Sequence, residues 1–128
     1  MNREKRIETV WQLIQALKNE PDVLILVEGQ RDMEALRRLG ITHEIKTVGG
    51  KRVFDDYSIF EGKNIIILTD FDHAGRVLFN RLRVELEVMG YRPCVYYWTT
   101  LRESTRGFIK AIEELDTYVQ SMKKEGII

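Results

Sequence analysis

The stretch "ILVEGQRD", residues 25–32, decides how this sequence is interpreted. It contains the end of an uninterrupted aliphatic run, 23–27, of the kind found in strands that are buried on both faces of a parallel sheet. The run stops at an acid and a glycine, Glu28 and Gly29. An acid at this point either faces water in a turn or belongs to a binding site, and the rest of the sequence bears on that choice.

Helices and strands alternate on both sides of this stretch. Apolar spacing predicts four helices, at 3–19, 31–39, 75–89 and about 104–124. Aliphatic and aromatic runs predict four strands, at 23–27, 44–48, 64–70 and 93–98. The alternation predicts a single α/β domain spanning residues 1–128, with a parallel sheet flanked by helices.

Composition limits the classes of partner. Twenty basic residues balance twenty acidic ones, so any contact with nucleic acid must come from a local patch rather than from net charge. The single cysteine, Cys94, has no partner for an intrachain disulfide, which fits a reducing cytoplasm. No apolar run approaches the length of a membrane span. We therefore expect a cytoplasmic protein that does not contact membranes.

Acids follow two of the predicted strands. Glu28 ends the first strand, and Asp70 and Asp72 end the third. Residues two apart in extended chain point the same way, and ligands of open parallel sheets bind at the carboxyl ends of the strands. Carboxylates crowded there need a cation, and hard oxygen ligands favour Mg²⁺ or Mn²⁺ over Zn²⁺. Taken singly, each acid also has a structural explanation: Asp72 as a helix N-cap, Asp70 as a strand end and Glu28 as a turn residue.

A phosphate-binding role is predicted for residues at the same edge. Gly29 and Gly75 would let backbone approach a phosphate closely, and Gly75 stands near the start of a helix. Lys51 and Arg52 follow two glycines after the second strand, and Arg76 would extend this basic track. Lys51 and Arg52 fit a solvated loop equally well.

Two motifs carry a resemblance to a known family. The strand ending in "VEGQRD" and the later strand ending in "ILTDFDHAG" resemble the Toprim domain, which occurs in topoisomerases, bacterial primases, recombination-repair proteins and small nucleases of ribosomal-RNA maturation. The similarity covers about residues 20–100. The whole chain is most similar to the short stand-alone Toprim proteins of archaea, a group of uncharacterised function.

The resemblance implies a Rossmann-like, four-stranded parallel sheet in the order 2-1-3-4. It implies that Glu28 binds metal or acts as general acid and base, and that Asp70 and Asp72 bind Mg²⁺, with Mn²⁺ as a substitute. In a two-ion arrangement Asp70 would be shared by both ions, with Glu28 on one ion and Asp72 on the other. Ala74 stands where topoisomerases have a third acid, so the pattern is more nuclease-like or primase-like. In the predicted fourth strand, Tyr96 and Tyr97 would be core and face residues.

Two hypotheses of function follow. The first is Mg²⁺-dependent nuclease-like or nucleotidyl-transfer chemistry on RNA or DNA phosphodiesters, with Glu28 as the catalytic residue. The second is a non-catalytic, metal-dependent module that binds a nucleotide or an RNA end within a larger complex, together with a protein partner or a second copy of the chain. A phospho-acceptor receiver domain is disfavoured, because the first strand does not end in an acidic pair and no fifth strand is predicted.

Overall fold

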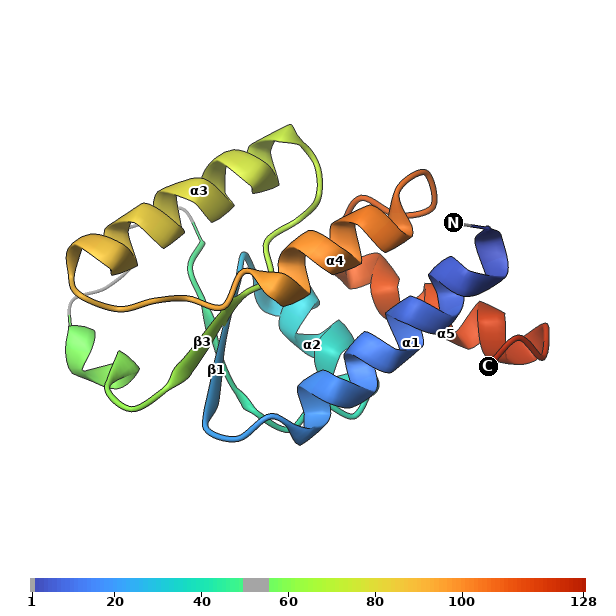
Figure 1. Cartoon of the computed structure of the whole chain (residues 1–128), viewed down its shortest axis with the longest axis horizontal. Helices are drawn as coiled ribbons and strands as arrows, with labels where there is room; N and C mark the ends of the chain where they lie inside the picture. The colour runs from blue at the N-terminus through green and yellow to red at the C-terminus, as the bar shows by residue number, and fades with distance from the viewer. Residues whose placement is uncertain (1, 50–55) are drawn as a thin grey trace.

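The computed structural model of the chain describes residues 2–49 and 56–128 (Figure 1). Its helices are α1 (Arg3–Asn19), α2 (Gln30–Arg38), α3 (His73–Val88), α4 (Tyr96–Thr105) and α5 (Leu115–Lys124), with short 3₁₀ turns η1 (Tyr57–Phe60) and η2 (Ile112–Glu114). Its strands are β1 (Val23–Val27), β2 (Glu44–Thr47) and β3 (Asn64–Ile67).

The strands form one parallel sheet in the order β2-β1-β3. Leu24 pairs with Glu44 on one side and with Ile65 on the other. All five residues of the central strand β1 are buried, as its unbroken aliphatic sequence predicts, whereas the edge strand β2 is largely exposed. The α/β class and the order of the first three strands are therefore confirmed.

The predicted fourth strand, 93–98, is wrong, and the sheet of the described residues has three strands rather than four. Cys94 forms only an isolated bridge to Ile66, with its amide donating to the carbonyl oxygen of Ile65 at 2.8 Å. Tyr96 and Tyr97 instead begin α4. The physical reason is periodicity, because the buried residues of this segment recur at helical spacing: Tyr97, Trp98, Leu101, Ser104 and Thr105.

The predicted helix at about 104–124 is also divided. α4 ends at Thr105, and α5 begins only at Leu115. Gly107 has a φ of +86°, which is left-handed backbone that no helix continues through. The intervening residues, 106–111, form a loop that leads from α4 to η2.

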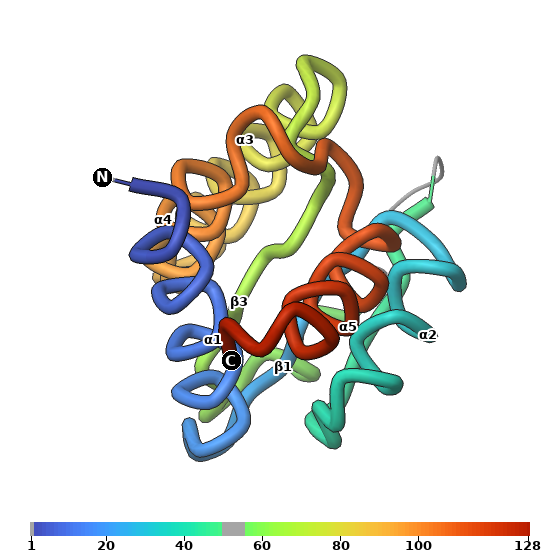
Figure 2. The backbone as a smooth tube through the Cα atoms, turned by 90° about the vertical axis from the view of Figure 1, so that its right-hand side faces the viewer, coloured from blue at the N-terminus to red at the C-terminus, as the bar shows by residue number. Residues whose placement is uncertain are grey.

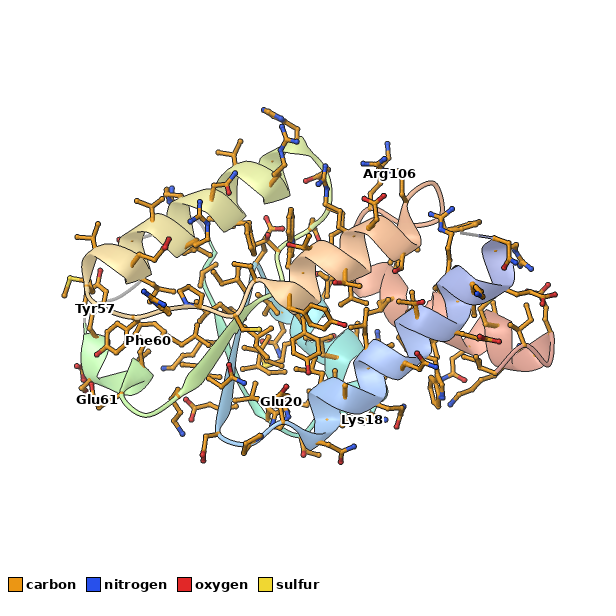
Figure 3. The ribbon with its side chains drawn as sticks, in the orientation of Figure 1. Lys18, Glu20, Tyr57, Phe60, Glu61 and Arg106 are labelled. Atoms are coloured by element: carbon orange, nitrogen blue, oxygen red, sulfur yellow. The ribbon has the colours of Figure 1, made fainter. Side chains whose placement is uncertain are left out.

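Helices cover both faces of the sheet. Figure 2 shows α1, α3 and α4 on one side of the strands and α2 and α5 on the other. α1 packs on α4, and the hydroxyl of Tyr97 donates to the carboxylate of Glu20 at 2.9 Å. Figure 3 labels Glu20 at the C-terminal end of α1. Within the described ranges no helix has both the length and the apolar character needed to cross a membrane.

The carboxyl ends of β1 and β3 lie side by side. The amide of Leu68 donates to the carbonyl oxygen of Leu26 at 2.8 Å, which extends the pairing just past the end of β3. Because parallel neighbours end at the same edge, the residues that follow β1 and β3 meet there. These residues include all three of the predicted metal-binding acids.

Candidate metal site at the carboxyl edge of the sheet

Glu28 and Asp70 are in direct contact at this edge. The Oε2 atom of Glu28 accepts a hydrogen bond from the amide of Asp70 at 2.8 Å. Asp72 lies two residues further on as the N-cap of α3, where its Oδ1 accepts from the amide of Gly75 at 2.8 Å. Asp72 thus has the structural role of an N-cap, at the same edge as the other two acids.

Each of the three carboxylates uses one oxygen to bind backbone. Asp70 Oδ1 accepts from the amide of Ile112 at 2.8 Å, as Glu28 Oε2 and Asp72 Oδ1 do from their own amides. The second oxygen of each receives no hydrogen bond from a backbone amide or a cationic side chain of residues 2–49 and 56–128. The backbone therefore orients the three acids through one oxygen of each, and it holds the carboxylates of Asp70 and Glu28 within hydrogen-bonding reach of each other.

The electrostatics of Asp70 reflect this crowding. Burial raises the pKa of its carboxyl from 3.8 to about 6, against the opposing effect of the Ile112 amide, and the charges of Glu28 and Asp72 add to the increase. The surroundings of Asp70 thus resist its ionisation. A bound cation would reverse this penalty by favouring the ionised carboxylate.

The donors fit magnesium in chemistry but do not form a complete cage. In the parts of the chain that the structure describes, no group of three or more His, Cys, Asp or Glu side chains is arranged to hold a metal ion. Mg²⁺ commonly takes one or two carboxylates and completes its shell with waters and substrate phosphate. The carboxylates of Glu28, Asp70 and Asp72 match that requirement in chemistry, with substrate supplying the remaining ligands.

A fourth acid, Asp32, belongs to the same cluster and was not predicted as a site residue. Only 7% of Asp32 is exposed, its carboxylate accepts from the amide of Gly29 at 3.0 Å, and the backbone amide of Glu113 lies close to it. Burial raises the pKa of Asp32, and the charge of Asp70 raises it further. Its place in "EGQRD", three residues after Gly29 at the start of a helix, was the available signal.

Residues 98–112 form hydrogen bonds with three consecutive residues of the loop that follows β3. The indole Nε1 of Trp98 donates to the carbonyl oxygen of Thr69 at 2.9 Å. The amide of Ile112 binds Asp70, and the amide of Phe71 donates to the carbonyl oxygen of Lys110 at 2.7 Å. Side-chain and backbone groups from 98–112 therefore fix the position of Asp70.

Gly75 is required for close packing at this site. A Cβ atom on Gly75 would lie 2.0 Å from the carbonyl oxygen of Asp70, which no side chain permits. Thr69 ties the same turn together, since its hydroxyl donates to the carbonyl oxygen of Gly75 at 2.7 Å. Gly29 differs, because a Cβ there would meet nothing within 4 Å.

The phosphate-binding role predicted for five residues stays a prediction. The amides of Gly29 and Gly75 already donate to Asp32 and Asp72, so they are engaged within the protein. Arg76 is exposed in the first turn of α3, at the same edge as the acids. The two remaining residues, Lys51 and Arg52, lie outside the described residues.

Comparison with known families decides the classification. The Toprim domain family matches residues 22–92, which include Glu28, Asp70 and Asp72. The chain belongs to the Toprim family. The resemblance noted from the two sequence motifs is therefore confirmed, and Toprim membership indicates a metal-dependent role connected with nucleic acid.

Archaeal relatives resemble this Toprim protein over nearly its whole length. A UPF0292 protein of Methanosarcina acetivorans is 33% identical and covers 96% of this chain and 89% of its own. A UPF0292 protein of Methanocaldococcus jannaschii is 30% identical, with coverages of 93% and 96%. A solved structure of a protein from Aquifex aeolicus has a TM-score of 0.70 and 28% identity, and covers 81% of this chain and 95% of that one. The archaeal similarity thus extends past residue 92, into the segment whose backbone binds Asp70.

Proposed function

We propose that this Toprim protein catalyses Mg²⁺-dependent chemistry at nucleic-acid phosphodiesters, with hydrolytic cleavage as the reaction the site suits best. The observation that carries the proposal is the hydrogen bond of 2.8 Å from the Asp70 amide to Glu28, which brings two carboxylates together, with no cationic side chain of residues 2–49 or 56–128 paired to either of them. Asp72 adds a third charge at the same edge. Such a cluster is favourable once a divalent cation and a phosphate are bound.

Each residue has a distinct part in the reaction. Mg²⁺ bound at Asp70 and Asp72, as one ion or two, would supply Lewis-acid stabilisation of charge on the phosphoryl oxygens. Glu28 is held by the Asp70 amide through Oε2, so its other oxygen is free to take a proton from an attacking water. The Ile112 amide holds Asp70 in position and lowers the cost of its ionisation.

Substitution of Glu28 by Gln tests this role. Gln keeps an oxygen for the Asp70 amide but cannot take a proton, so we expect an intact fold and cleavage at least about 100-fold slower. The measurement is single-turnover cleavage of single-stranded and hairpin RNA and DNA with Mg²⁺. Glu44→Gln is the matched control, because Glu44 is exposed at the start of β2, at the opposite edge. An unchanged rate in Glu28→Gln would refute the catalytic role.

A second candidate is a binding module that holds a nucleotide or an RNA end without turning it over, within a larger complex. The observation in its favour is that the described residues contain no ready three-ligand metal group, and that Asp72 already serves as a helix N-cap. Under this hypothesis a 5′-phosphorylated oligonucleotide binds with Mg²⁺ and is recovered unaltered. Product of shorter length, absent from the Glu28→Gln reaction, would exclude it.

A further inference from the structure

A cavity of about 610 Å³ lies beside the acidic edge, between α2, η2 and α5. Its wall includes Arg31 and Glu34 from α2, Phe108 and Ile109 from the loop between α4 and η2, Glu113 from η2 and Tyr118 from α5. This volume is within the range of about 300–1,000 Å³ that is typical of small-ligand sites. Most of its wall comes from residues beyond 92, outside the part of the chain that matches the Toprim family.

The cavity is joined to the candidate metal site through η2. The amide of Ile112 binds Asp70, and the next amide, that of Glu113, lies close to the carboxylate of Asp32. The side chain of Glu113 lines the cavity, and Arg31 directly precedes Asp32 on α2. A ligand in the cavity would therefore lie beside the carboxylates, and η2 would contact both the ligand and the acids. Figure 2 shows α2 and α5 next to each other on this side of the sheet.

The aromatic residues of the cavity are suited to a flat ligand. Phe108 is 42% exposed although it is a large apolar residue, and its ring centroid lies 5.8 Å from that of Tyr118 at an interplanar angle of 28°. The guanidinium of Arg6 lies 4.8 Å from the Phe108 ring centroid and helps to fix the ring in place. Exposed aromatic rings beside a phosphate-processing site are how proteins stack unpaired bases.

The charged residues of the cavity complement a nucleotide. Arg31, which directly precedes Asp32, is exposed and forms no ion pair with residues 2–49 or 56–128, so its guanidinium is available to a phosphate. Glu34 and Glu113 are exposed carboxylates, which accept hydrogen bonds from the amino groups of bases and from ribose hydroxyls. The cavity thus combines a stacking surface, a phosphate donor and acceptors for a base.

We propose that this cavity binds the base of one unpaired nucleotide and places the adjoining phosphate at Arg31, beside the metal site. The inference rests on the proposed function in taking nucleic acid as the ligand. It specifies the substrate class, since a base inside a continuous duplex must first be unpaired and unstacked, at a cost of a few kcal/mol, before it can enter such a cavity. Single-stranded or looped nucleic acid is therefore the preferred substrate over blunt duplex.

The test is a nuclear magnetic resonance titration of the full-length protein with uridine and adenosine 5′-monophosphates, without Mg²⁺ and then with it. Ribose 5-phosphate is the ligand that lacks a base. We expect shifts of the backbone signals around Phe108, Glu113 and Arg31, and weaker or no shifts there with ribose 5-phosphate. Phe108→Ala should weaken nucleotide binding about tenfold. Tyr96→Ala, which removes a 58% exposed ring outside the cavity, should leave binding unchanged.

Two results would overturn the proposal. One is equal binding of ribose 5-phosphate and the nucleotides with no effect of Phe108→Ala, which would place recognition in the phosphate alone. The other is no binding of any nucleotide by a folded wild-type protein. Failure of the proposed catalytic function gives a different pattern, because nucleotide binding without Mg²⁺ would persist while the Glu28→Gln and wild-type proteins showed equal rates.

Discussion

Substitution of Asp70 by Asn is expected to stabilise the protein in the absence of metal. The asparagine would still offer an oxygen to the amide of Ile112, and its side-chain amide would donate to Glu28, whereas the native carboxylate repels it. The variant therefore removes an unfavourable charge but retains the hydrogen bond that positions the residue. Stabilisation by loss of a charged group is unusual for an ordinary surface acid and is a specific consequence of the crowding at this edge.

The size of this stabilisation and its dependence on pH follow from the pKa of Asp70. The folded pKa of Asp70 is about 6, against 3.8 in the absence of perturbation, so folding favours its protonated form. The protonated Asp70 contributes fully to the free energy of unfolding below about pH 4, and this contribution is lost as the pH rises through 6. Each pKa unit corresponds to about 1.4 kcal/mol, and partial solvent screening reduces the total to about 1–2 kcal/mol at pH 8. That is a rise in Tm of roughly 3–8 °C for a domain of this size.

Thermal unfolding at several pH values measures this effect. Wild type and Asp70→Asn should unfold at the same temperature near pH 4, diverge between pH 4 and 6, and differ by a constant amount above pH 7. Addition of Mg²⁺ at pH 8 should raise the Tm of wild type and leave that of the variant unchanged, because only a protein that binds the ion in its folded state is stabilised by it.

Asp116→Asn is the matched control. Asp116 is also buried, but its Oδ2 lies 2.8 Å from Nε of Arg38, so its charge is compensated. The same change of side chain should therefore destabilise the protein at this position, by about 1–2 kcal/mol. If Asp70→Asn is equally or less stable than wild type at pH 8, or if its effect does not vary with pH, the argument from crowded carboxylates is refuted.

Three further predictions concern the same edge. Gly75→Ala should cost more than about 3 kcal/mol in urea denaturation and abolish metal binding, because its Cβ would overlap the Asp70 carbonyl, whereas Gly29→Ala should cost less than about 1 kcal/mol. Trp98→Phe keeps an aromatic ring but leaves the carbonyl oxygen of Thr69 without its hydrogen-bond donor, so it should lower the free energy of unfolding by about 1–2 kcal/mol. An unchanged free energy of unfolding would show that water takes the place of the indole. Mn²⁺ affinity should fall as the pH drops below 6, because protons compete at Asp70; constant affinity from pH 5 to 8 would contradict the raised pKa.

The sequence was sufficient for the central part of the sheet. An aliphatic run such as 23–27 has one stable environment, a strand buried on both faces, and the acid directly after it then has to lie at a sheet edge. The prediction of a fourth strand was wrong because the stretch "PCVYYW", taken by itself, is rich in strand-forming residues. The apolar spacing continues through Leu101 to Thr105 and is helical.

The identity of the acids was predictable, but their hydrogen bonds were not. Glu28 and Asp70 stand out because acids follow buried strands. The partner of Asp70 is the amide of Ile112, 42 residues away, and a backbone amide leaves no residue-specific mark on the sequence. The contribution of the C-terminal segment depends on the turn at Gly107, which places η2 against the site rather than within a continuous helix. Gly107 was the signal that the predicted helix at 104–124 overlooked.

The measurement that tests the central claim most directly is a titration with Mn²⁺, monitored by electron paramagnetic resonance. Wild type is compared with the Asp70→Asn/Asp72→Asn double variant, with and without a short single-stranded oligonucleotide. Asn keeps the oxygens that bind the amides of Ile112 and Gly75, so the fold is retained while the charges are lost. We predict saturable binding by wild type that is absent from the double variant and tighter when the oligonucleotide is present. Equal binding by the two proteins in both conditions would contradict the assignment of this edge as a metal site.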